Sequence, residues 1–184
     1  MPYRVTLKNP SFEDYAHFYD LRFKPNVVYW ADDYPRQMSL DEYAMDRLLA
    51  QQNGQILERI IVVNGEPVGT ITARDFIEQT CQCTLGIVIA DEHYWGRGIG
   101  SQALKLFLRL LSVEGFGLVV LETYANNKRA QRCFIKMGFQ KRRVFFAPQA
   151  GRFVVQMLRR LTPNETIGET IAYGDPRWKA PKNK

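Results

Sequence analysis

The stretch Tyr94-Trp95-Gly96-Arg97-Gly98-Ile99-Gly100, called the glycine stretch below, separates an extended pattern from a helical one. Residues 81–90 before it alternate as in a strand, and apolar residues after it recur at helical spacing up to Glu114. Glycines let the backbone approach a ligand closely, and the unpaired N–H groups at a helix start attract an anion. The stretch therefore predicts a phosphate site, with a simple chain-reversing turn as the alternative. Its spacing fits neither a P-loop nor a dinucleotide-binding fingerprint.

Outward from this stretch, the sequence predicts an α/β fold of the α+β type, in which helices flank a single mixed, mostly antiparallel, twisted sheet. Asn64-Gly65 indicates a tight hairpin, because this pair supplies the positive φ angles that a two-residue strand turn requires. Ser39 and Glu42 form a capping box, which marks a helix start. Residues 27–36 are interpreted as an aromatic and acidic loop. The expected strands span residues 3–7, 60–63, 68–76, 81–90, 118–121, 145–146 and 153–157. Two expected helices span residues 39–52 and 98–114. A third begins at Asn9 or Ser11 and runs to about residue 23, and a fourth begins at Asn126 or Asn127 and ends before Gly138.

Length and composition indicate one soluble globular domain. The chain has 184 residues, of which 46% are hydrophobic and 24% charged, and this balance argues against a fibrous or disordered protein. We expect the folded domain to cover residues 1–160 and residues 161–184 to form a polar, flexible C-terminal arm. No apolar run approaches the roughly 18 residues that cross a bilayer, and the first residues lack a secretory leader. We therefore expect a cytoplasmic protein with no membrane partner.

Charge and cysteine content narrow the classes of partner. Residues 1–90 hold 8 Lys and Arg against 12 Asp and Glu, whereas residues 91–184 hold 17 against 7. A basic half attracts anions, which include a phosphorylated cofactor and nucleic acid, and an acidic patch suits a cationic substrate. The three cysteines, Cys81, Cys83 and Cys133, lack the spacing of a zinc site. We expect packed thiols and no metal.

Further motifs follow the glycine stretch in a characteristic order. Leu121-Glu122-Thr123 ends a strand, Asn127-Lys128-Arg129-Ala130 opens a helix, and Met137-Gly138-Phe139 closes it. Over residues 81–139 these motifs resemble the GCN5-related N-acetyltransferase (GNAT) superfamily, and most nearly its bacterial ribosomal-protein and small-amine acetyltransferases. The resemblance implies an acyl-CoA N-acyltransferase fold. It also implies direct transfer of an acetyl group from acetyl-CoA, in a ternary complex, to a protein N-terminus, a polyamine or another small primary amine.

A cofactor site follows from the same resemblance. In the family, the glycine loop holds the diphosphate of acetyl-CoA, and the strand before the loop pairs with the pantetheine arm. The family motif Q/R-x-x-G-x-G/A falls on Trp95, Gly98 and Gly100, so Trp95 departs from the usual Gln or Arg. Cations after this motif are candidates to neutralise phosphates, although a solvated helix face would also explain most of them. The candidate cofactor-binding residues are Val88, Ile89, Arg97, Gly98, Ile99, Gly100, Ser101, Asn127, Arg132 and Lys136.

Acetyl transfer needs a neutral amine, a polarised thioester carbonyl and a proton for the leaving thiolate. A backbone N–H near the end of strand 81–90 is our candidate to polarise the carbonyl. Glu122 matches the general base of similar ribosomal-protein acetyltransferases, with a solvent-facing carboxylate at a strand end as the alternative. The Tyr that supplies the proton in much of the family is replaced by Phe134. Tyr124, Tyr94 or water would have to serve, and our catalytic candidates are Glu122 and Tyr124.

Acceptor binding is expected on the opposite side of the cleft, which in the family is lined by the first two helices and their loop. The candidates are Trp30, Asp32, Asp33 and Tyr34, which suit a cationic amine through carboxylate pairing and cation–π contact. Two alternative functions remain on the same fold. Phe134 favours a catalytically weak acyl-CoA-binding protein, and the basic half favours an RNA- or ribosome-binding module. A monomer and a homodimer are both compatible with the sequence.

Overall fold

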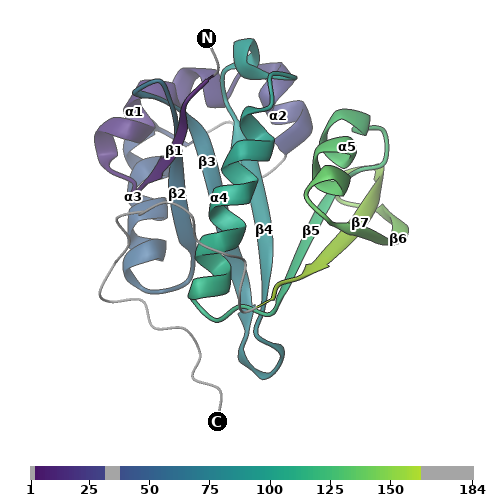
Figure 1. Cartoon of the computed structure of the whole chain (residues 1–184). Coiled ribbons are helices and arrows are strands. Elements are labelled where there is room, and N and C mark those ends of the chain that lie inside the picture. The colour runs from purple at the N-terminus through teal and green to yellow at the C-terminus, as the bar shows by residue number, and fades with distance from the viewer. Residues whose placement is uncertain (1–2, 32–37, 163–184) are drawn as a thin grey trace.

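The fold is built on one sheet of seven strands (Figure 1). A computed structural model describes residues 3–31 and 38–162. The strands lie in the order β1-β2-β3-β4-β5-β7-β6, and each neighbouring pair is antiparallel except β4 and β5, which run parallel. The predicted mixed, mostly antiparallel sheet is therefore confirmed. The strands are β1 (Val5–Lys8), β2 (Leu57–Val63), β3 (Glu66–Ile77), β4 (Gln82–Ile89), β5 (Leu118–Tyr124), β6 (Gln140–Ala147) and β7 (Arg152–Arg160).

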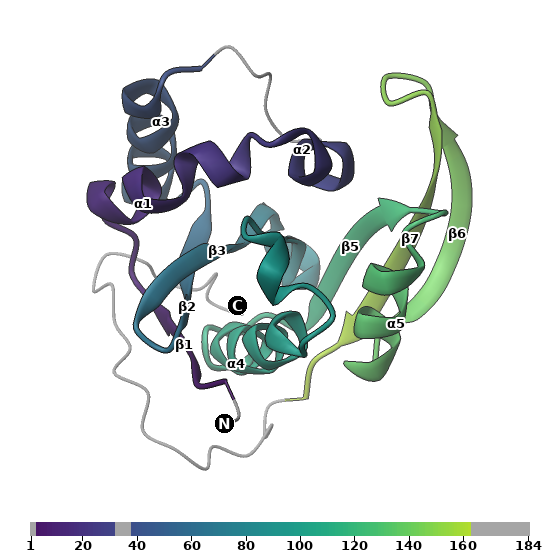
Figure 2. The same cartoon turned by 90° about the horizontal axis from the view of Figure 1, so that it is seen from above.

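Helices cover both faces of this sheet (Figure 2). α4 and α5 lie on one face, and α1, α2 and α3 lie on the other. Ala103, Phe107 and Leu110 of α4 are fully buried, as the helical spacing of the apolar residues predicts. Burial of one such large side chain contributes about 1.5–3 kcal/mol to folding. The helices are α1 (Phe12–Arg22), α2 (Pro25–Ala31), α3 (Leu40–Gln52), α4 (Ile99–Val113) and α5 (Lys128–Lys136).

The prediction of a loop at residues 27–36 is wrong for residues 27–31, because Pro25–Ala31 forms α2. Pro at the first helical position has a φ angle suited to the helix and lacks only an N–H that the helix leaves unpaired. The Val-Val-Tyr-Trp run that follows is typical of strands, which hides the helix in the sequence. Residues 32–37 lie outside the described residues. α2 packs towards β4 and brings the side chain of Trp30 to the site described below.

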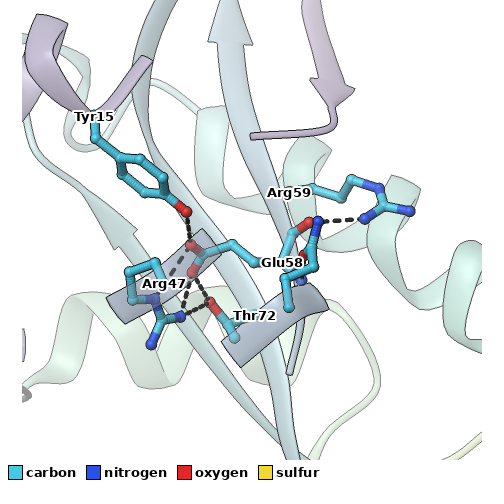
Figure 3. Close-up of polar contacts among 6 residues, drawn as sticks. Tyr15, Arg47, Glu58, Arg59 and Thr72 are labelled. Carbon is cyan, nitrogen blue, oxygen red and sulfur yellow. Dashed lines mark hydrogen bonds and ion pairs between the residues drawn. The ribbon is translucent and has the colours of Figure 1, made fainter. Parts of the chain in front are cut away.

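A buried polar cluster anchors α1 and α3 to the sheet (Figure 3). Glu58 of β2 is only 1% exposed, and its carboxylate accepts hydrogen bonds from Tyr15 of α1, Arg47 of α3 and Thr72 of β3. Burial, reinforced by the Glu58 carboxylate, raises the pKa of Tyr15 above its usual value. Because a buried carboxylate is costly unless it is paired and hydrogen-bonded, this cluster fixes where both helices meet the sheet.

The C-terminal end of the described chain is tied to the body of the domain. The backbone N–H of Leu161 donates to the carbonyl oxygen of Gly117 at 3.0 Å, and the Ser112 hydroxyl donates to the Thr162 carbonyl oxygen at 2.8 Å. The arm predicted at residues 161–184 otherwise lies outside the described residues. Among the helices of residues 3–31 and 38–162, none is long and apolar enough to cross a membrane.

Candidate acetyl-donor site between β4 and β5

A cavity opens where β4 and β5 separate. The two strands pair only over Gln82–Thr84 and Leu118–Val120, and beyond this point they diverge (Figure 1). The cavity has a volume of about 640 Å³ and is lined by the second half of β4, the glycine stretch, the end of β5 and one side of α5. α2 closes it from the other face of the sheet with Val27, Trp30 and Ala31. Parallel strands that part in this way leave backbone groups without a sheet partner.

The glycine stretch forms the start of α4 at one end of the cavity. Gly98 caps the helix with a φ angle of 83°, a left-handed conformation that favours glycine. The N–H of Gln102 donates to the Gly98 carbonyl oxygen at 3.1 Å and is the first to bond within the helix. The amides of residues 99–101 therefore have no acceptor within the helix, and these residues line the cavity. Three free amides at the positive end of a 15-residue helix make this place a candidate anion site.

α5 lies directly against this anion site. The Ser101 hydroxyl and the Cys133 sulfur are 3.2 Å apart, and an ideal Cβ on Gly100 would lie 3.7 Å from the same sulfur. Burial raises the pKa of the Cys133 thiol. Cys83 is fully buried and Cys81 is partly buried, and neither forms a disulfide.

Polar side chains fix the junction between β5 and α5. The Asn127 side chain caps α5 by accepting a hydrogen bond from the Ala130 N–H at 3.1 Å, and it lines the cavity. The buried Gln131 amide donates to the carbonyl oxygens of Tyr124 and Ala125 at 3.1 and 2.9 Å. The end of β5 and the first turn of α5 are therefore held as one unit beside the cavity.

The predicted phosphate-binding cations are placed differently from one another. Arg132 and Lys136 line the cavity from α5. The Arg97 guanidinium instead donates to the Tyr3 hydroxyl at 2.8 Å and does not line the cavity. Arg129, which is not among the predicted cofactor-binding residues, also lines the cavity and stacks on the Trp95 ring, with its Cζ 3.9 Å from the ring centroid. Residues 129, 132 and 136 are three and four residues apart, so the sequence already indicates that Arg129 shares a helix face with Arg132 and Lys136.

The end of β4 presents alternate backbone groups to the cavity. The Ala90 N–H donates to the Val68 carbonyl oxygen on the β3 side at 2.8 Å. Because successive residues of a strand direct their N–H and C=O groups to opposite sides, Val88 also bonds towards β3, and Ile89 points towards the gap. The Trp95 indole N–H donates to the Ile89 carbonyl oxygen at 2.8 Å. Of the two candidate oxyanion donors, Ile89 is the one directed at the cavity.

The catalytic candidates are only partly brought together. Glu122 lines the cavity, and its exposed carboxylate accepts a hydrogen bond from the Gln156 side chain at 2.8 Å. Tyr124 does not line the cavity, and its ring lies 4.7 Å from the guanidinium carbon of Arg152. Tyr94 does line the cavity. Phe134, which stands where the family has a Tyr, is buried with its ring 6.0 Å from that of Phe139.

The acceptor side is described only in part, because Asp32, Asp33 and Tyr34 lie outside the described residues. Trp30 does line the cavity, from α2. Next to it, the Arg152 guanidinium lies 3.7 Å from the centroid of the Tyr29 ring and donates to the Tyr29 carbonyl oxygen at 3.0 Å. This contact joins α2 to β7 and was not apparent from the sequence, because the two residues are far apart along the chain.

Comparison with protein families identifies the class of enzyme. Residues 4–140 match the family model of the acetyltransferase (GNAT) domain. The chain therefore belongs to the GNAT family of acetyltransferases, whose acetyl donor is acetyl-CoA. This membership confirms the resemblance inferred from the glycine stretch and the motifs that follow it.

Individual known proteins show similarity over most of the chain. The aminoglycoside N(6')-acetyltransferase type 1 of Klebsiella pneumoniae is 24% identical over 160 residues, which cover 78% of each protein. The spermidine N-acetyltransferase of Vibrio cholerae, solved with CoA and spermine, has a TM-score of 0.75 at 14% identity and covers 85% of this chain and 95% of its own. A ribosomal-protein alpha-N-acetyltransferase, solved with CoA, has a TM-score of 0.77 at 16% identity and covers 87% and 96%. These similarities confirm the acyltransferase fold.

Proposed function

We propose that the chain transfers the acetyl group of acetyl-CoA to a primary amine by direct transfer within a ternary complex. The observation that carries this proposal is the anion site at the start of α4, placed at one end of a cavity that continues between two diverging strands towards Glu122 and Trp30. A long donor with phosphates at one end and a reactive group at the other suits this shape. The similar proteins named above act on aminoglycosides, spermidine and a ribosomal protein, all of which carry amines.

The chain's own residues fit the donor. The amides of residues 99–101 would hold the diphosphate, because they lack helical partners, and Gly98 and Gly100 add no side chain there. Arg132 and Lys136 would neutralise phosphate charge from α5. The side of β4 that faces the gap near Val88 and Ile89, together with the capping residue Asn127, would face the pantetheine arm. Arg97, directed at Tyr3, has the least support among the proposed cofactor-binding residues.

When bound, acetyl-CoA supplies a thioester, whose C–S bond breaks as a C–N bond to the amine forms, so that one proton leaves nitrogen and one reaches sulfur. The Ile89 N–H, directed at the gap, would donate a hydrogen bond to the carbonyl oxygen. Glu122 would accept the amine proton. Between the two tyrosines considered as proton donors, the lining of the cavity favours Tyr94 over Tyr124.

A second candidate function has one specific observation in its favour. Phe134 is buried and provides no hydroxyl at the position where much of the family has a proton donor. A protein that binds acyl-CoA without rapid turnover would have this feature.

The two functions are separated by incubating the protein with acetyl-CoA and a panel of amines. The panel contains spermidine, an aminoglycoside and a peptide with a free N-terminus, and an N-acetylated form of the same peptide is the matched control. Free thiol and product mass are scored. We expect thiol release with at least one free amine and none with the blocked peptide. If CoA raises the melting temperature of the protein but no amine of the panel causes release of the thiol from acetyl-CoA, the second function is favoured.

A further inference from the structure

A stacked pair of side chains connects the two edges of the cavity. Trp95 precedes α4 on the β4 side, and Arg129 lies in the first turn of α5 on the β5 side. The Arg129 guanidinium stacks on the indole with its Cζ 3.9 Å from the ring centroid, and the indole N–H is anchored on the Ile89 carbonyl oxygen at 2.8 Å. Trp95 therefore holds the guanidinium at a fixed place on the cavity wall.

The stacked guanidinium keeps its hydrogen-bond donors available. A guanidinium that stacks through its flat face directs its N–H groups outward in the plane. Within residues 3–31 and 38–162, no hydrogen-bond or ion-pair partner of the Arg129 guanidinium is found. The Arg129 side chain is exposed where it lines the cavity. A cation with accessible, unpaired donors on a cavity wall is suited to an anionic ligand.

The position of Arg129 relative to the anion site follows from α5. Cys133 contacts Ser101 in the first turn of α4 at 3.2 Å. Arg129 precedes Cys133 by one helical turn on the same face, which separates the two positions by about 6 Å. Arg129 and the amides of residues 99–101 therefore border the same end of the cavity.

We propose that Arg129 binds the diphosphate of the acetyl donor together with these amides, and that Trp95 is the residue that positions it. This inference rests on the proposed function and deepens it. The family motif has Gln or Arg at the position of Trp95, and an indole offers no cation there. In this chain Arg129 brings a cation to the Trp95 ring from α5, and the indole provides the face that orders it.

Calorimetry with three ligands tests this assignment. CoA carries the diphosphate and a 3′-phosphate, dephospho-CoA carries the diphosphate alone, and acetyl-pantetheine carries neither. We expect Arg129→Gln to raise the Kd for CoA and for dephospho-CoA about 10- to 100-fold, in line with the loss of a charged hydrogen bond, and to leave acetyl-pantetheine binding unchanged. Lys128→Gln is the matched control, because it removes the same charge from the same helix at a residue that does not line the cavity. It should change each Kd by less than about twofold.

The positioning role of Trp95 is tested with Trp95→Phe and Trp95→Leu, after melting curves confirm that both variants fold. Phe keeps an aromatic face for stacking and Leu does not, so we expect the Leu variant to weaken CoA binding more than the Phe variant does. Arg129→Gln should have little further effect in the Leu background, because the two residues act as one unit.

Every outcome decides between the alternatives. Wild-type protein that binds none of the CoA forms overturns the proposed function itself. If wild-type protein binds CoA and Arg129→Gln behaves as Lys128→Gln does, only this inference is wrong. If Arg129→Gln binds CoA more tightly than wild-type protein does, the stacked Arg129 and Trp95 side chains cover the diphosphate site. If Arg129→Gln weakens the binding of CoA but not of dephospho-CoA, Arg129 binds the 3′-phosphate and not the diphosphate. If it weakens the binding of acetyl-pantetheine equally, the role of Arg129 is structural. Each of these three results overturns the assignment.

Discussion

Gly69 of β3 approaches Val88 of β4 so closely that an ideal Cβ on Gly69 would lie 2.0 Å from the Val88 carbonyl oxygen. Residues 69 and 89 are paired across the two strands at the end of β4 that borders the cavity. The absence of a side chain at Gly69 therefore determines how the end of β4 lies against β3. The direction of the Ile89 amide depends on this contact.

Gly69→Ala is expected to destabilise the protein by about 1–3 kcal/mol, because the added methyl group meets backbone that must move. The matched control is Gly86→Ala, since a Cβ on Gly86 would have nothing within 4 Å. Thermal melts of both variants check the difference. If Gly69→Ala and Gly86→Ala melt at the same temperature, β3 and β4 accommodate a methyl group at residue 69 without loss of stability.

Glu122→Gln is expected to lower kcat by about 100-fold or more, because the variant cannot accept the amine proton. Glu114→Gln serves as control, since Glu114 carries a carboxylate outside the cavity lining. Steady-state rates are measured across pH with the best amine of the panel. If both variants keep the wild-type profile, Glu122 is not the base.

The cluster around Glu58 predicts a dependence of stability on alkaline pH. Tyr15 keeps its proton in the folded state, because burial and Glu58 raise its pKa above the ordinary value of 10.0. The unfolded chain then loses this proton first as the pH rises, so the stabilisation is complete below about pH 10 and declines above it.

Tyr15→Phe should remove about 1–3 kcal/mol of stability at neutral pH, since Glu58 loses a hydrogen-bond donor. It should also flatten the decline at alkaline pH. Denaturant unfolding from about pH 7 to pH 11 measures both effects. Tyr29→Phe removes a hydroxyl from a residue that is 44% exposed and lies outside the Glu58 cluster, and it should leave the curve unchanged. If the free energy of unfolding of Tyr15→Phe declines with alkaline pH as steeply as that of the wild type, the predicted contribution of Tyr15 is contradicted.

Cys133 reports on occupancy of the anion site, because it lies against Ser101 at the cavity wall. Burial raises the pKa of its thiol, so alkylation is best followed at a mildly alkaline pH. We expect CoA to slow alkylation of Cys133 at least tenfold, as read by peptide mass spectrometry, when the ligand is near saturation.

Two other thiols are internal controls for this labelling. Cys81 is partly exposed and lies outside the cavity lining, so CoA should not change its rate. Burial raises the pKa of Cys83 to about 12, and this thiol should stay unmodified in the folded protein. A Cys133 rate that is the same with and without CoA would place the ligand elsewhere.

The sequence predicted the elements whose periodicity was strong. Apolar spacing found α4 with its buried stripe, and the Ser39 capping box predicted the start of α3, where the Glu42 N–H donates to the Ser39 hydroxyl at 3.2 Å. The start of β2 was placed too late, because Glu58 and Arg59 are polar residues that resemble a loop. The burial of Glu58 depends on partners from α1 and α3, which no local pattern indicates.

The sequence places the backbone elements of the candidate site better than it places the side chains around it. Glycines and a helix start at residues 94–100 predict an anion site through local conformation alone. Whether Arg97 or Arg129 faces the cavity depends on tertiary contacts, with Tyr3 in one case and Trp95 in the other. For the same reason, the sequence left Tyr94 and Tyr124 open as proton donors, and only the placement around the cavity distinguishes them.

A crystal structure of the protein with CoA tests the central claim most directly. The account predicts diphosphate oxygens about 2.7–3.2 Å from the amide nitrogens of residues 99–101, with the pantetheine arm entering the gap between β4 and β5. A diphosphate bound anywhere else on the protein, or a start of α4 that stays empty at saturating CoA, would contradict it.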